Sequence, residues 1–447
     1  MASAAEQLAA NINWGAFSKA TELKRRIWFT LGALIVARIG AYITIPGIDA
    51  RIFSQIFAQH SGGVLGMVDM FAGGAISRMT VFALGIMPYI SASIIMQLLT
   101  SVSPQLEALK KEGEAGRKKI NQYTRLGTVV LAFAQAWGIA NGLQGLDGGS
   151  AVLQPGIQFI LTTAITLTGG TIFLMWLGEQ ITARGIGNGI SLIIFAGIVA
   201  QLPFSFVQLL EQLRAGSVSG FFVAFIAVLA VAVITGIVFV ERAQRRIVVQ
   251  YPKRQVGNRM FGGENSHLPL KLNVAGVIPP IFASSLLLLP LTIVGFVGTD
   301  ANTPVWLQTI VASLGHGQPL YIALYVGLIV FFSFFYTAIV FNPEETAENL
   351  KKYGGFVPGI RPGKNTAEYL DFVLTRLTVL GAAYLSAVCV LPEILVSRYS
   401  VPFYFGGTSL LIVVSVTMDT VAQIHSHLLA HQYEGLIKKT KLKGRRG

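Results

Sequence analysis

The sequence predicts an all-α polytopic membrane protein that crosses the bilayer with ten helices. Of its 447 residues, 53% are hydrophobic and 12% are charged, whereas a soluble domain carries about 25% charged residues. Apolar runs such as Ile27–Ile45 and Leu320–Phe341 reach about the 20 residues that a helix needs to cross about 30 Å of hydrocarbon. The strands of a membrane barrel are shorter and alternate in polarity, so the continuous runs exclude a barrel.

The chain before the first run is predicted to be a cytosolic N-terminal segment, residues 1–26. It carries Glu6, Glu22 and the basic cluster Lys24-Arg25-Arg26. No short apolar core with a small-residue cleavage site follows this cluster, so the segment is not expected to be a cleaved signal peptide.

Ten apolar stretches follow one another as the predicted spans. The tenth is the most polar, because Ser415, Thr417 and Asp419 interrupt it, so we expect it to face protein or water rather than lipid. The ten predicted spans are Ile27–Ile45, Met79–Thr100, Tyr123–Leu143, Ile157–Leu177, Asn188–Phe206, Gly220–Val240, Asn273–Val297, Leu320–Phe341, Phe372–Leu391 and Gly407–Gln423.

Ten spans divide into two halves of five, and this parity makes the first and sixth spans enter from opposite sides. Two halves related by an axis in the membrane plane, an inverted repeat, are therefore a natural hypothesis. The predicted parts are residues 27–206 with spans one to five, residues 207–427 with spans six to ten and the large loops 241–272 and 342–371, and a basic tail, residues 428–447.

The positions of the basic residues test this division, because they collect in cytosolic loops. Of the 34 Lys and Arg residues, 29 lie before span one, after an even-numbered span or in the tail. Both termini and the two large loops are therefore predicted to be cytosolic. The exceptions are Arg38, Arg51, Arg78, Arg214 and Arg398.

Between spans one and two lies an apolar segment, Gly62–Ile76, that is too short to cross a bilayer and has glycine pairs near both ends. One interpretation is a short amphipathic helix on the outer surface. The other is a half-helix folded into the protein, since glycines at both ends allow tight turns and movement. Composition alone does not separate the two.

Eight short motifs resemble the SecY family, in the expected order among the ten spans, and they are closest to its bacterial members. The motifs are Met70–Ala75, Gly85–Ile95, Gly185–Ser191, Gln244–Ile247, Leu268–Lys271, Gly276–Pro279, Phe356–Gly363 and Val401–Leu410.

The resemblance implies a protein-conducting channel of the bacterial inner membrane, with an hourglass pore between two inverted five-helix halves. Secretory polypeptides and their signal sequences would pass through it, and membrane proteins would leave sideways into lipid. A plug helix, Gly63–Ile76, would close the pore. Its named residues are Gly66, Met67, Val68, Asp69, Met70, Phe71, Ala72, Gly73 and Gly74.

The resemblance also implies a pore ring and a lateral gate between spans two and seven. By composition alone an isoleucine in a span is ordinary packing, but a ring of branched apolar side chains disfavours a continuous water column and so holds back ions. Amides between spans close a gate without locking it. The implied ring is Ile86, Ile90, Ile194, Ile281, Ser285 and Ile412, and the implied gate residues are Ser91, Gln97, Gln135, Asn273 and Leu289.

The two large loops have two interpretations. They anchor the topology by contacting anionic membrane lipid, or, as the resemblance implies, they dock the motor ATPase SecA and the ribosome, whose RNA phosphates suit a basic surface. Small membrane subunits resembling SecE and SecG are the other implied partners. The implied docking residues are Arg245, Arg246, Lys253, Arg254, Arg259 and Arg361.

No enzyme activity, cofactor or metal site is expected. The glycine-rich stretch Gly185–Gly189 joins two spans and lacks the Gly-Lys-Ser or Gly-Lys-Thr of a phosphate loop. His427 and His431 lack further ligands for a metal, and the single cysteine, Cys389, excludes an intramolecular disulfide. The alternative function is a polytopic secondary transporter, but such proteins place ionisable residues near the membrane midplane, whereas Arg38 and Asp419 lie toward span ends.

Overall fold

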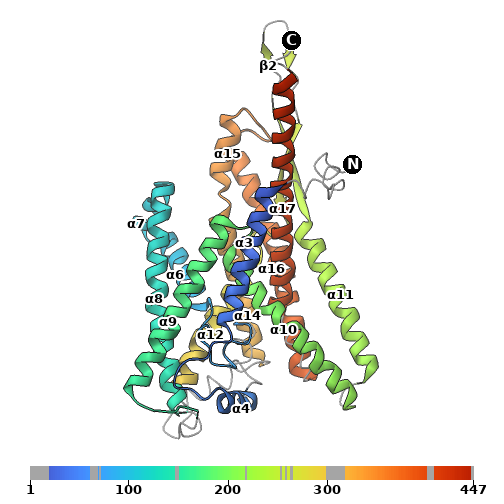
Figure 1. The fold of residues 1–447 in the computed structure, drawn as a ribbon. Coiled ribbons are helices and arrows are strands. Elements are labelled where there is room, and N and C mark those ends of the chain that lie inside the picture. The colour runs from blue at the N-terminus through green and yellow to red at the C-terminus, as the bar shows by residue number, and fades with distance from the viewer. Residues whose placement is uncertain are drawn as a thin grey trace.

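The computed structural model describes residues 20–60, 69, 72–145, 151–216, 219–251, 254–256, 259–261, 265–297, 318–399 and 407–443. Within these residues the molecule is a bundle of long helices that run side by side, with a small β-hairpin at one end (Figure 1). The start of α3, α15 and the hairpin lie at that end, which we call the basic end, and α4 lies at the opposite end.

Each predicted span coincides with a helix, and seven described helices are long and apolar enough to cross a membrane. Local signals mark several helix starts: Asn188 caps α10 by accepting the N–H of Ile190 at 3.1 Å, and Ser219 caps α11 by accepting that of Phe222 at 3.3 Å. The span helices are α3 (Thr21–Gly40), α6 (Met87–Val102), α8 (Glu114–Gly145), α9 (Ile157–Arg184), α10 (Gly189–Arg214), α11 (Gly220–Arg242), α12 (Ile278–Val297), α14 (Pro319–Val340), α16 (Lys364–Tyr399) and α17 (Gly407–Lys443).

The second helix begins at Met87 rather than at Met79 as the sequence predicts. The residues before it bond to the chain that follows α3: the N–H of Ile45 donates to the oxygen of Met79 at 3.0 Å, and that of Val81 to Ile43 at 2.9 Å. Met79 and Gly85 take positive φ angles of 44° and 55°. A backbone held in this way cannot form the i to i−4 bonds of a helix.

A short helix, α4 (Ala50–His60), lies at the opposite end and was not predicted. Phe53, Ile56 and Phe57, spaced at i, i+3 and i+4, face inward and pack against Ile45 and Phe159. The helix therefore closes the opposite end of the first half.

The main core lies between the span helices near mid-height, and the outer faces of those helices are apolar as well. On α11, for example, Phe221, Val228 and Phe239 are exposed. An apolar outer surface around a packed core is what a hydrocarbon solvent requires. The core includes Ile94, Leu177, Ile198, Phe282, Ile329 and Leu411.

At the basic end the two large loops join into one unit. Strands β1 (Gln244–Gln250) and β4 (Asn265–Lys271) pair antiparallel, and β2 (Arg254–Val256) pairs with β3 (Arg259–Phe261) beyond them. Gln250 and Phe356 exchange two backbone hydrogen bonds, of 2.9 and 3.0 Å, so the hairpin is tied to the loop between α15 (Pro343–Lys352) and α16. Beneath this bridge Ile247, Val357 and Leu370 share one apolar cluster.

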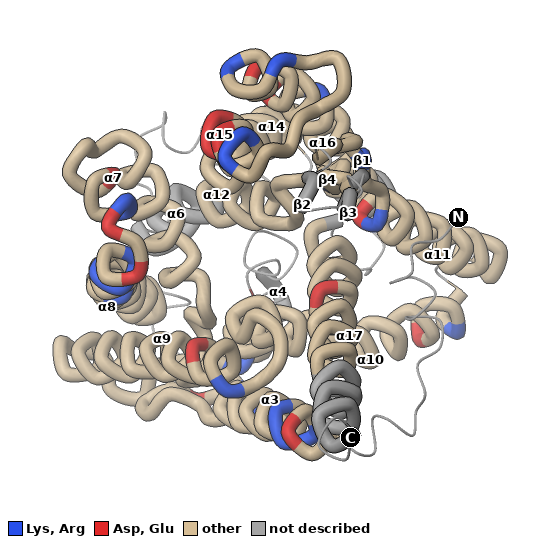
Figure 2. Tube along the Cα trace, turned by 90° about the horizontal axis from the view of Figure 1, so that it is seen from above, with Lys and Arg blue, Asp and Glu red and all other residues tan. Residues whose placement is uncertain are grey.

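Two further helical features shape this end. The helix α7 (Pro104–Lys111) and the first turns of α8 carry Lys and Arg toward the viewer in Figure 2. The last helix, α17, is continuous over 37 residues and crosses the predicted boundary between residues 427 and 428 without a break.

Candidate functional site

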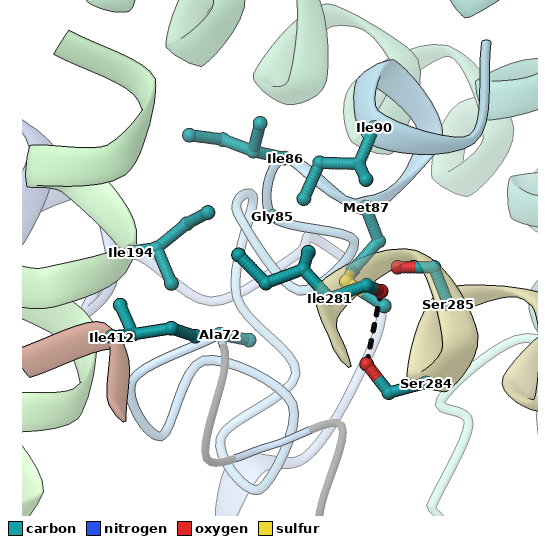
Figure 3. A pocket seen from close by; sticks show the side chains of 10 residues that line it. All are labelled: Ala72, Gly85, Ile86, Met87, Ile90, Ile194, Ile281, Ser284, Ser285 and Ile412. Carbon is teal, nitrogen blue, oxygen red and sulfur yellow. Dashed lines mark hydrogen bonds between the residues drawn. The ribbon is translucent and has the colours of Figure 1, made fainter. Parts of the chain in front are cut away.

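A narrow cavity lies in the middle of the bundle, lined by residues that are far apart in the sequence (Figure 3). The isoleucine side chains approach it from different helices: α10 and α17 on one side, α12 on the other, and the start of α6 above them. All six predicted ring residues are among those that line it. The described residues that line it are Ala72, Gly85, Ile86, Met87, Ile90, Ile194, Ile281, Ser284, Ser285 and Ile412.

This lining is almost entirely apolar. Ser284 is satisfied within its own helix, because its hydroxyl donates to the oxygen of Ile281 at 3.0 Å. The Ser285 hydroxyl is buried and has no hydrogen-bond partner in the described part of the chain. One free hydroxyl among branched aliphatic side chains does not support a continuous file of water, so the constriction disfavours ions.

Ala72 lies beside Ile412 in Figure 3, below the other isoleucines, and belongs to the segment predicted as the plug. Of the residues predicted to form the plug, the structure describes Asp69, Ala72, Gly73 and Gly74. Gly73 and Gly74 have φ angles of 67° and 81°, which glycine adopts without strain. The predicted plug residues Gly66, Met67, Val68, Met70 and Phe71 lie outside the described residues.

The Asp69 carboxylate holds the turn at the C-terminal end of the plug. Its Oδ1 accepts the N–H groups of Ile76 at 2.8 Å and Ser77 at 2.9 Å, and its backbone oxygen accepts the N–H of Gly74 at 2.9 Å. Burial raises the pKa of this carboxyl, whereas the two N–H donors favour its charged form. The turn is thus fixed to one buried side chain.

Arg38 also reaches the plug, and sequence reasoning missed it as a site residue. Its guanidinium Nη1 donates to the backbone oxygen of Gly73 at 2.6 Å. The available signal was its position: Arg38 is one of five basic residues off the cytosolic pattern and lies within a span, where a cation is costly.

The predicted gate helices are in contact, since α12 packs against both α6 and α8. Their shared seam is apolar and includes Ile94, Phe282 and Leu287. The predicted gate residue Ser91 is buried in α6, and the side chain of Leu289 in α12 lies outside the described residues.

The three predicted gate amides are not joined to one another. Gln97 Nε2 donates to Ser93 in its own helix at 3.4 Å, and Gln135 is half-buried in α8. Asn273 Nδ2 instead donates to Glu241 Oε1 at 2.7 Å and to the oxygen of Gly276 at 3.0 Å. Asn273 lies two residues after the end of β4, which places its side chain beside Glu241 at the end of α11.

The predicted docking residues that the structure describes lie at the basic end. Arg245 and Arg246 are exposed on β1, and Arg361 is exposed on the turn before α16. Arg254 and Arg259 stand in the paired strands β2 and β3, with their side chains outside the described residues, and Lys253 also lies outside them.

A family model described as SecY matches residues 80–421. The chain belongs to the SecY family. Within this family, protein translocase subunit SecY of Escherichia coli (strain K12) is 57% identical over 424 residues, which cover 95% of this chain and 96% of that protein. The residues that the family model matches include every ring position.

Two solved structures of protein channels share the SecY fold of this chain. One, from work on the SecY plug domain that stabilises the closed channel and maintains a membrane seal, aligns with a TM-score of 0.65 at 21% identity and covers 91% of this chain and 92% of that one. The other, Sec61 in the canine ribosome-channel complex from the endoplasmic reticulum, aligns with a TM-score of 0.60 at 19% identity and the same coverage of both chains.

Proposed function

We propose that this chain is the pore subunit of a protein-conducting channel. It passes secretory polypeptides across the bacterial inner membrane and releases membrane proteins sideways into lipid. The observation that carries the proposal is the constriction, where isoleucines from α10, α12, α17 and the start of α6 surround one cavity with Ala72 of the plug segment beside it. An apolar ring grips a passing chain without specific bonds and stays dry when empty.

The roles of the named residues follow from this proposal. Ile86, Ile90, Ile194, Ile281 and Ile412, with Ser285, form the pore ring, and residues 63–76 form the plug. The seam between α12 and the pair α6 and α8 is the lateral gate, because its apolar contacts can part without breaking strong polar bonds between the helices. The two halves, residues 27–206 and 207–427, move apart on either side of it.

Energy and guidance come from partners. The joined loops 241–272 and 342–371 form one exposed basic surface that suits SecA and the RNA of a ribosome, and a Sec61 relative is known within a ribosome-channel complex. SecE and SecG complete the membrane complex, anionic lipid contacts the basic end, and both termini are cytosolic. We assign no catalytic activity, cofactor or metal to the chain.

A secondary transporter is the alternative from sequence, and the family match does not support it. The residues that line the constriction include no ionisable side chain. A transporter that couples substrate to an ion gradient needs such groups near the membrane midplane.

Reconstitution tests the proposed function. The chain is co-expressed with SecE and SecG, purified, and placed in liposomes with SecA, ATP and a radiolabelled precursor protein. We expect the precursor to become protected from added protease, and a precursor without its signal sequence to stay accessible. Absence of protected precursor in liposomes that hold the intact three-subunit complex would exclude the proposal.

A further inference from the structure

Arg38 makes one strong polar contact, and that contact is to the plug. It lies in the last turn of α3 and donates from Nη1 to the Gly73 oxygen at 2.6 Å. A hydrogen bond from a charged donor is stronger than a neutral one, especially where water is scarce. In the described part of the chain no carboxylate lies within ion-pair distance of Arg38, so the plug carbonyl is its main acceptor.

Gly73 is held between two helices. A Cβ added there would lie 2.6 Å from Arg38 Nη1 and 2.8 Å from the Cα of Gly197 in α10. Its φ of 67° is also in the region that favours glycine. The plug backbone therefore fits into the crease between α3 and α10, with Arg38 on one side and Gly197 on the other.

The aromatic ring of Tyr42 contacts the Arg38 side chain and helps to position it. Its guanidinium carbon lies 5.6 Å from the ring centre of Tyr42, within the range of a cation–π contact. Arg78 lies closer to the same ring, at 4.3 Å, but no hydrogen bond joins it to the described part of the plug. Arg78 thus shares the surroundings of Arg38 without its contact to Gly73.

Arg38 also lines a second cavity, beside the constriction, together with Ala72, Ile86 and Ile194. Of the described residues that line it, Arg38 alone is charged. Its other described partner is the aromatic ring of Tyr42, so loss of the Gly73 bond leaves the guanidinium without a strong acceptor until water enters.

We propose that Arg38 is a latch that holds the plug in its seat through the Gly73 carbonyl, and that this bond must break before the plug can leave. The inference rests on the proposed function, since it takes residues 63–76 as a plug. Because the acceptor is a main-chain atom, the latch does not depend on the side chains of the plug. Arg38 acts as a positioning residue: it contacts the seal and not the transported polypeptide.

The test is the accessibility of the seated turn. Ala75 has an exposed fraction of 0%, so Ala75→Cys reacts with a membrane-impermeant thiol reagent only while the plug is displaced. In intact cells, Arg38→Met should label roughly tenfold faster than the parent, or more, as expected for the loss of a hydrogen bond to a charged group. Arg38→Lys, which keeps the charge and a donor, should label at a rate between the two.

Arg78→Met is the matched control, because Arg78 is a cation beside the same tyrosine that acts on Asp69 only through its charge and makes no hydrogen bond to Gly73, and it should label much more slowly than Arg38→Met. Gly73→Ala disturbs the Arg38–Gly73 hydrogen bond from the plug side and should accelerate labelling as Arg38→Met does. A parent-like rate in both Arg38→Met and Gly73→Ala overturns the latch, and so does equal acceleration by Arg78→Met. Labelling needs no transported polypeptide, so its failure is distinguishable from failure of the proposed translocation.

Discussion

At the scale of single residues, the closed state depends on side chains that have no group to which water can hydrogen-bond. Ile412 is 1% exposed and lines the cavity from α17, opposite the short run of α12 that contributes Ile281. The one polar atom without a partner in this lining, the Ser285 hydroxyl, leaves little tolerance for another.

We therefore expect Ile412→Asn to loosen the seal. A buried amide recruits water, because an unpaired polar group in an apolar site is costly. Resting ion conductance in a planar bilayer should rise several-fold, and precursors with defective signal sequences should be exported. Ile412→Val is the control, since it stays apolar and should remain silent; equal conductance in both variants would contradict the role of polarity.

We expect Asp69 to give the seal a pH dependence. It lies between α4 and α6, outside the spans, and burial raises its pKa in the seated plug. The seated state thus binds a proton more readily than the displaced state, whose carboxyl titrates near its ordinary value of about 4. Protonation strengthens seating at low pH, and this contribution is lost as pH rises through the raised pKa.

We expect resting conductance of the parent to be lower at pH 5 than at pH 8. Asp69→Asn keeps the Oδ1 acceptor for Ile76 and Ser77 without a charge, so its conductance should not change over this range. Asp69→Ala leaves two N–H groups without their acceptor and should leak at both pH values. A parent whose conductance is the same at pH 5 and pH 8 would contradict the role of the carboxyl.

At the scale of elements, α15 and the turn that follows it present Arg361 from a rigid support. The Arg361 backbone oxygen accepts the Thr366 hydroxyl at 2.9 Å, and the nearby Phe356 is tied to β1. A side chain on such a support meets a partner without a large loss of loop entropy.

Charge reversal at this position should stop motor-driven export while the protein stays folded and inserted. We expect Arg361→Glu to reduce export of a precursor in cells at least tenfold, as for a lost charge contact at an interface. Lys118→Glu reverses an exposed cation on α8, outside the two docking loops, and serves as the control, with export near normal. Normal export by Arg361→Glu at normal protein levels would remove it from the docking surface.

Hydropathy predicted the long helices but missed the shorter elements that pack against their ends. A helix such as α14 is continuous and apolar, so composition decides it. The residues just before α6 are largely apolar too, yet Thr80 pairs with Thr44 in the chain after α3, and only tertiary contacts decide that. The search for apolar runs missed the hairpin of β1 and β4 because its strands carry charged residues. The helix α4 carries an i, i+3, i+4 apolar pattern that a finer search for periodicity would have found.

At the scale of the whole molecule, the ring residues are separated by up to most of the chain and still line one cavity. Composition cannot select them from the many isoleucines of the spans, so their prediction depended on the resemblance of motifs. The role of the gate amides stays a prediction, and in this state Asn273 bonds to Glu241. Arg38 lay in no motif, and only the fold brings it to Gly73.

The topology is tested with single cysteines. The native Cys389 is buried, at 3% exposed, and should not react. With an impermeant thiol reagent added to intact cells, Ser54→Cys on α4 should label, whereas Ser266→Cys on β4 and Asn349→Cys on α15 should not. All three side chains are exposed on the protein, so the bilayer alone separates them. Labelling of the β4 or α15 position from outside would reverse the predicted orientation.

The unbroken α17 has a mechanical consequence. A straight helix of 37 residues is about 55 Å long at 1.5 Å per residue, and Ile412 lies near one end while the other stands beyond the bundle at the basic end (Figure 1). Such a rod transmits torque: a small sideways push on its free end turns it about the packed middle and displaces the isoleucine in the opposite direction. A force on the far end of α17 would therefore change the width of the constriction, although it acts far from Ile412.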